Sequence, residues 1–159
     1  MAFSLFTCGL IEDENTSLSP ARNIEGTWQT PFPVTFLIKT DFCSDNLELV
    51  ASEEREVTMI ITERSDYTVN IELRYTSSNF TVLDSQCDPT GYVPDISPMY
   101  LKGIISSTQL TVMNSEGRVL GIFQFTTDLM EGTWSDLWCA IFCQNVYTED
   151  NQLKLVRQH

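Results

Sequence analysis

The chain has 159 residues, of which 42% are hydrophobic and 11% aromatic, and this composition is typical of one globular domain rather than of a disordered segment. Its 9 basic and 22 acidic side chains give a formal net charge of −13, which opposes binding to nucleic acid and to anionic lipid surfaces. The single histidine is His159, the last residue, so catalysis by a histidine base and zinc sites built on histidine are excluded. The acidity has two interpretations: it keeps an exported protein soluble, or it attracts a basic protein partner.

Residues 1–22 are expected to form a segment apart from the domain, which then occupies residues 23–159. Leu5-Phe6-Thr7-Cys8-Gly9 resembles the lipobox of bacterial lipoproteins, in which the cysteine is lipidated, and the acidic stretch that follows resembles a tether. This resemblance implies an exported protein, either a cell-surface or periplasmic lipoprotein or a secreted one, that meets a membrane only through a lipid on Cys8. The alternative is an apolar N-terminal strand that docks on the domain.

After Asn23 the sequence predicts short β-strands separated by turn-forming clusters. The clearest strand is Tyr67–Tyr75, where apolar and polar residues alternate along the whole run. Glu56–Glu63 precedes it across a turn short enough for a hairpin, and connections this short join antiparallel neighbours. The other predicted strands are Val34–Lys39, Phe80–Leu83, Met99–Ser106, Gln109–Met113, Val119–Thr127 and Gln152–Arg157.

Two stretches interrupt this pattern. In Asp45–Arg55, Leu47, Val50 and Ala51 have helical spacing, so a short helix and a strand or loop are both compatible with the sequence. Asp84–Pro98 contains three prolines and a glycine, which break both helix and strand. Loops of this length are commonly lids or binding elements.

The five cysteines suggest disulfide bonds. When Cys8 is set apart, an even number remains, and we predict the bridges Cys43–Cys87 and Cys139–Cys143, with crossed pairs as the alternative. No Cys-x₂-Cys spacing or second histidine is present, so neither a metal site nor a cofactor is expected. Buried free thiols in a cytosolic protein are the other interpretation.

The tetrapeptide Glu-Gly-Thr-Trp occurs twice, at residues 25–28 and 131–134. We expect the first and last strands to meet, with Trp28 and Trp134 packed at their junction. When an antiparallel meander closes into a barrel, no strand edge is left unpaired. The sequence therefore predicts an all-β fold, an antiparallel meander closed into a barrel of about 8–10 strands.

Gly-x-Trp on the first strand, the meander and the late Gly-Thr-Trp-Ser resemble the small bacterial lipocalin-like, or calycin-like, proteins. In lipocalins the Trp of Gly-x-Trp packs across the closed end of the barrel, and a basic residue near the last strand lies over it. The matching residues here are Gly26, Trp28 and Arg157. The resemblance implies a cup for a small apolar ligand, with loops around its open mouth.

An eight-stranded barrel is either filled by its own side chains or holds one small ligand, and the sequence leaves both options open. Tyr92 and Tyr100, in and beside the proline-rich segment, are candidate ligand contacts, because tyrosine offers a large contact area with a polar group. Tyr67 and Phe123 are further candidates from the predicted inner face. That face comprises Tyr67, Val69, Ile71, Leu73, Tyr75, Leu110, Val112, Phe123 and Phe125.

The sequence thus predicts a non-catalytic, exported protein that binds a small ligand. The alternative is an exported β-barrel that acts as an interaction protein or as an inhibitor of a basic cell-wall-active enzyme, since complementary charge steers such an encounter. An enzyme would have to use paired carboxylates, for which Glu131 and Asp136 beside Trp134 are the candidates. We expect these two to be solvated surface groups instead.

Overall fold

The computed structural model describes residues 20–40, 48–84, 97–135, 146–148 and 151–159. Within these residues one short helix precedes ten strands, so the fold is all-β, as predicted. The elements are α1 (Pro20–Ile24), β1 (Gly26–Gln29), β2 (Val34–Thr40), β3 (Glu48–Ser65), β4 (Thr68–Val82), β5 (Met99–Ser106), β6 (Gln109–Met113), β7 (Val119–Phe125), β8 (Leu129–Trp134), β9 (Val146–Thr148) and β10 (Asn151–Gln158).

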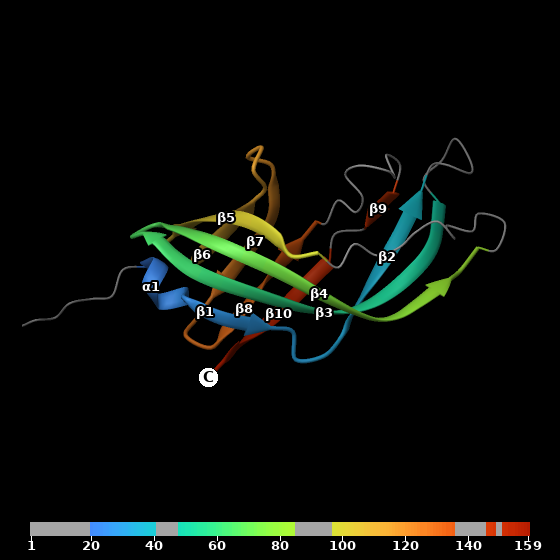
Figure 1. Ribbon diagram of the computed structural model, residues 1–159, viewed down its shortest axis with the longest axis horizontal. Helices are drawn as coiled ribbons and strands as arrows, with labels where there is room; N and C mark the ends of the chain where they lie inside the picture. Colours follow the sequence, from blue (N-terminus) through green and yellow to red (C-terminus); the bar gives the residue numbers. More distant parts are fainter. Residues whose placement is uncertain (1–19, 41–47, 85–96, 136–145, 149–150) are drawn as a thin grey trace, which may run out of the picture.

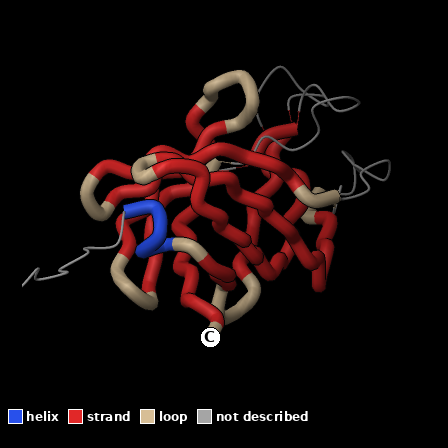
Figure 2. The backbone as a smooth tube through the Cα atoms, turned by 60° about the vertical axis from the view of Figure 1, so that its left-hand side comes forward, coloured by secondary structure: helices blue, strands red, loops and turns tan. Residues whose placement is uncertain are grey.

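The strands form a closed antiparallel barrel. Neighbours follow the order β1-β10-β8-β7-β6-β5-β4-β3, and β3 pairs with β1 to close the ring of eight. Figures 1 and 2 show the ring, with α1 at one end of it. The first and last strands meet directly, since Trp28 on β1 lies opposite Arg157 on β10. The predicted barrel is confirmed.

β1 and β2 are two pieces of one interrupted strand that runs beside β3. Gln29 pairs with Thr58 on β3, and β2 resumes at Val34, which pairs with Arg55. The interruption contains Pro31 and Pro33, which cannot donate hydrogen bonds to a sheet. β9 pairs with the far side of β2, so β2, β9 and the adjoining parts of β3 and β4 extend the wall beyond the ring (Figure 1).

Most predicted strands are confirmed, and two differ. The predicted segments Tyr67–Tyr75 and Phe80–Leu83 belong almost entirely to one long strand, β4. Asp45–Arg55 is a strand from Glu48 onward, so the helical alternative is wrong for that part, while residues 45–47 lie outside the described residues. In both places pairing along β3 decides the conformation, because β3 is hydrogen-bonded on both sides.

The predicted inner face is correct except at Tyr67. The other eight residues are buried, whereas the Tyr67 side chain is 58% exposed. Tyr67 precedes the first residue of β4 and lies in the turn, where its carbonyl accepts a hydrogen bond from the Ile105 backbone at 2.9 Å. The alternation of β4 therefore begins one residue later than predicted.

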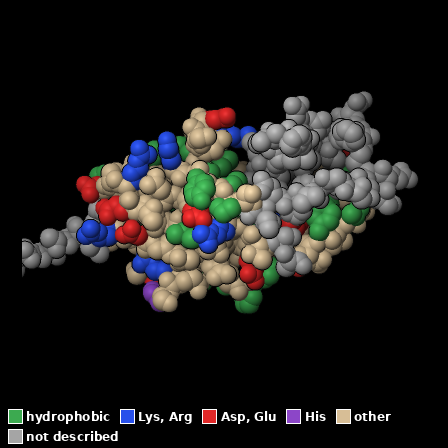
Figure 3. Space-filling model, viewed as in Figure 1, with side chains coloured by type: hydrophobic (Ala, Val, Ile, Leu, Met, Phe, Trp, Pro, Cys, Tyr) green, Lys and Arg blue, Asp and Glu red, His purple; other side chains and the backbone are tan. Residues whose placement is uncertain are grey.

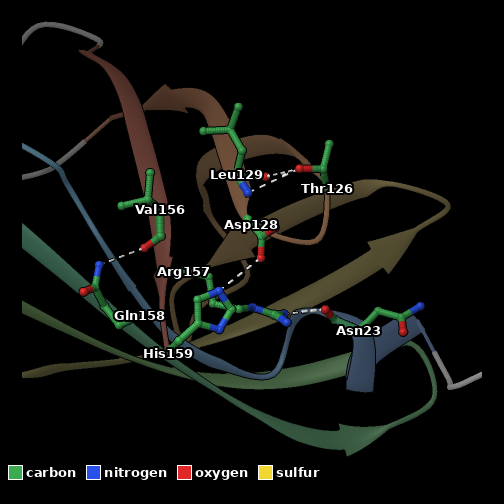
Figure 4. Close-up of polar contacts among 8 residues, drawn as sticks. All are labelled: Asn23, Thr126, Asp128, Leu129, Val156, Arg157, Gln158 and His159. Atoms are coloured by element: carbon green, nitrogen blue, oxygen red, sulfur yellow. Dashed lines mark hydrogen bonds and ion pairs between the residues drawn. The ribbon is translucent and has the colours of Figure 1, made fainter.

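The barrel end next to α1 is filled by side chains. Ala21 and Ile24 of α1 are buried, and the Ile24 carbonyl accepts a 2.8 Å hydrogen bond from Nε1 of Trp28. The Arg157 guanidinium lies 4.7 Å from the Trp28 ring centre, and its Nη2 donates to the carbonyl of Asn23 (Figure 4). No helix of the described chain is long and apolar enough to cross a membrane.

The two repeated tryptophans lie at different levels of the barrel. Trp28 is opposite Arg157, whereas Trp134 is opposite Asn151 at the other end of β10. The expectation that both pack at one junction is therefore wrong. Each Trp sits at an inward position of its strand, and each is fully buried.

Candidate functional site

Two inward positions of β3 carry charge. Burial alternates along this strand, so Glu53 and Arg55 point to the same side as Val57, Met59 and Ile61. Both charged side chains are fully buried, and Nη2 of Arg55 donates to Oε2 of Glu53. Burying two charged groups in an apolar barrel costs desolvation free energy that their attraction does not always offset. The pair is therefore weak evidence for stability and a candidate for function.

Aromatic rings surround the guanidinium of Arg55. The ring centre of Phe36 on β2 is 4.8 Å from its central carbon, and that of Tyr75 on β4 is 5.3 Å away. The two rings meet edge to face at 6.4 Å and 76°. Nε1 of Trp134 donates to the Tyr75 hydroxyl at 3.1 Å. We call these five residues, Glu53, Arg55, Phe36, Tyr75 and Trp134, the interior polar site.

The neighbouring strands explain how these residues come together. β2 and β4 flank β3, and Phe36 is opposite Glu53 while Tyr75 is opposite Val57. Along β3, Glu53 and Arg55 lie between Val57 of the main core and a smaller apolar cluster in the extended wall. That smaller cluster consists of Ile38, Val50 and Ala51, with Phe80 packed against them.

One acceptor of the site is unsatisfied. Oε1 of Glu53 is buried and has no hydrogen-bond partner among the described residues. A buried acceptor without a partner costs about 1–3 kcal/mol, and more when it is charged. A group that brought a hydrogen-bond donor to this oxygen would recover that cost.

A second feature is a groove on the outside of the barrel. It has a volume of about 340 Å³ and lies over β3, β4 and β5. Tyr100 lines it with a side chain that is 75% exposed. Its outward-facing lining residues are Ile60, Thr62, Asn70, Glu72, Tyr100 and Lys102, and we call this feature the outer groove.

The predicted ligand contacts do not converge on one place. Tyr100 lines the outer groove, and Tyr67 is exposed in a turn outside it. Phe123 is inside the barrel, with its ring 6.3 Å from that of Trp134. Tyr92 lies outside the described residues. Sequence reasoning missed Glu53 and Arg55, because charged residues are not expected at inward positions of a strand.

The cysteine predictions stay predictions. All five cysteines lie outside the described residues, so neither the lipid on Cys8 nor the Cys43–Cys87 and Cys139–Cys143 bridges are tested. Among the described side chains no cluster of three or more metal-ligating groups occurs. Glu131 is exposed and pairs with Lys154 at 2.9 Å, while Asp136 is outside the described residues.

No protein-family model matches the chain, and no curated protein matches it. Among solved structures, it is similar to a de novo designed fluorescence-activating β-barrel, with 18% identity over 88% of this chain and 98% of that one. The TM-score is 0.39, which is too low for this similarity to carry an argument.

Proposed function

We propose that this is a non-catalytic, exported, lipocalin-like protein that binds one small, largely apolar ligand inside its barrel. The observation that supports the proposal is the interior polar site, a buried ion pair among aromatic rings in an otherwise apolar interior. The apolar part of the ligand would lie among inward-facing side chains, and its polar group would reach Glu53. A closed barrel of eight strands is either filled by its own side chains or holds one small ligand, and the proposal takes the second option.

Energetics favour a binding role over a purely structural one. Replacing a buried ion pair with apolar side chains of similar volume is often neutral or stabilising. The barrel end around Trp28 is filled mainly by apolar side chains and contains no buried ion pair among the described residues. Glu53 and Arg55 are therefore better explained by recognition of a ligand than by stability.

The unsatisfied oxygen indicates the class of ligand. Oε1 of Glu53 needs a hydrogen-bond donor, which the hydroxyl of an alcohol or the N–H of an amide supplies. The Glu53–Arg55 pair carries no net charge, so a ligand with its own charge would add an uncompensated one to an apolar interior. We therefore propose an apolar alcohol or amide.

Native mass spectrometry of the protein purified from its own host tests this function. We expect a bound small molecule in the wild type and its loss in Glu53→Leu/Arg55→Met. The control is Glu131→Gln/Lys154→Gln, which removes an exposed ion pair and should keep the ligand. A ligand retained equally by both variants would place binding elsewhere.

Export is the part of the proposal that depends on the N-terminal segment. Cys8 lies in a sequence that resembles a lipobox, and the acidic composition suits an exported protein. Intact-mass measurement of the same purified sample tests it, because lipidation of Cys8 adds acyl chains and makes this cysteine the first residue. An unmodified N-terminus that still includes Met1 would contradict the lipoprotein.

A further inference from the structure

The outer groove has polar residues on its central strand, β4, and one apolar or aromatic residue on each flanking strand, Ile60 on β3 and Tyr100 on β5. Its outward-facing residues form two rows across three strands: Ile60, Glu72 and Tyr100 lie opposite one another in the first row. Thr62, Asn70 and Lys102 form the second row. Because neighbouring strands are about 4.8 Å apart, each row places three side chains within about 10 Å.

Tyr100 is the most exposed tyrosine described in the structure. Its side chain is 75% exposed, and it is fixed on a strand rather than in a loop. Figure 3 shows exposed hydrophobic side chains between acidic and basic ones on the barrel face that includes β5. A rigid aromatic ring at the side of a concave surface offers a flat platform for a ligand.

The polar residues of the groove offer several kinds of hydrogen-bonding group beside the Tyr100 ring. Glu72 is held by Arg74 through a 2.7 Å ion pair, which keeps its carboxylate in place. Lys102 forms no ion pair with any residue in the described ranges, so its ammonium can donate to a ligand. Asn70 adds an amide, and Thr62 a hydroxyl.

We propose that the outer groove binds a sugar ring of a β-linked oligosaccharide. The C–H face of such a ring is flat and apolar and can stack on Tyr100, while its equatorial hydroxyls point to the polar side chains of β4 and to Lys102. This site is separate from the interior polar site, because outward-facing side chains of β3, β4 and β5 form it.

Size and composition favour a sugar over other ligands. A volume near 340 Å³ lies at the small end of the range for small-molecule sites. A stable protein partner would need about 800 Å² of surface on each side, much more than one groove of this size provides. A purely apolar ligand would bury the polar groups of Asn70 and Lys102 without giving them hydrogen bonds.

Isothermal titration with cellohexaose and chitohexaose tests the proposal on the full chain. We expect at least one of them to bind the wild type, and Tyr100→Ala to weaken this binding at least tenfold. Tyr100→Trp should preserve the binding, because the larger ring keeps the platform. Lys102→Met should weaken it less than Tyr100→Ala does.

Tyr67→Ala is the matched control, because Tyr67 is also exposed on this barrel but does not line the groove. It should leave the affinity unchanged, and thermal melting should show that all variants are folded. The proposal is overturned if neither hexasaccharide binds, or if Tyr100→Ala binds as well as the wild type. Equal weakening by Tyr67→Ala and Tyr100→Ala would also overturn it.

Discussion

The guanidinium of Arg157 on the last strand lies 4.7 Å from the ring centre of Trp28 on the first strand. The same guanidinium binds the carbonyl of Asn23, while His159, two residues further on, pairs with Asp128 (Figure 4). The resemblance to lipocalins implied this contact between a basic residue and the Gly-x-Trp tryptophan. The contact lies at the barrel end next to α1, which is filled by side chains.

Arg157→Met should destabilise the protein by about 1–2 kcal/mol, because it removes the cation–π contact and a hydrogen bond but keeps most of the apolar stem. Urea unfolding measures the change. Lys154→Met is the control on the same strand, since it removes a surface pair and should change the stability by less than about 0.5 kcal/mol. Equal effects of the two substitutions would contradict a specific role for Arg157.

For the Glu53–Arg55 pair we predict that replacing one residue lowers the stability more than replacing both. Arg55→Met leaves the Glu53 carboxylate buried without its ion-pair partner and should cost about 3–5 kcal/mol. Glu53→Leu/Arg55→Met removes both charges and should restore stability to near or above that of the wild type. A double variant as unstable as Arg55→Met would show that the pair itself stabilises the fold. Chemical denaturation of both single variants and the double variant completes the cycle.

The alternation of apolar and polar residues explains why much of the barrel could be predicted. Val69, Ile71 and Leu73 alternate with polar residues, and all three are buried in the barrel. The same rule failed for the first half of β3, because Glu53 and Arg55 place charge where an inner face normally has apolar residues. The charged residues that depart from the pattern belong to the candidate site. The local sequence alone could not show that these residues point inward.

The repeated Glu-Gly-Thr-Trp motif needs its two glycines for different reasons. Gly26 has a φ of +134°, a backbone conformation that other residues rarely adopt, with open space around it. At Gly132 an added Cβ would lie 2.0 Å from the Ile122 carbonyl oxygen and 2.6 Å from the Phe123 Cα on the adjacent strand. The two motifs are identical in sequence, but Gly26 is needed for its positive φ and Gly132 for the close approach of the adjacent backbone.

Gly132→Ala should accordingly destabilise the barrel more than Gly26→Ala. Strain at a positive φ costs about 1–3 kcal/mol. A clash with backbone on β7 cannot be relieved by a side-chain rotation, so we expect more than about 3 kcal/mol or a failure to fold. Thermal melting ranks the two variants. If Gly26→Ala proves the less stable, the close approach of β7 and β8 at Gly132 is wrong.

The candidate site depended on contacts that no single segment contains. Phe36, Arg55 and Tyr75 lie on three strands, and their convergence depends on the register that β2 takes beside β3 after the break from β1. The prolines that cause this break were visible in the sequence, but the register that follows from it was not. Tyr100 was predicted as a ligand contact, yet its position on the outer wall depends on the strand phase of β5.

Binding of 1-decanol and of decyl methyl ether, measured by displacement of a hydrophobic dye, tests the central claim most directly. The two molecules have nearly the same shape, but only the alcohol can donate a hydrogen bond to Oε1 of Glu53. A hydrogen bond to a charged group contributes about 1.5–3 kcal/mol, so 1-decanol should bind roughly tenfold to a hundredfold more tightly than the ether. That preference should disappear in Glu53→Leu/Arg55→Met. Equal affinity of the wild type for both molecules, or no binding of either, would contradict the account.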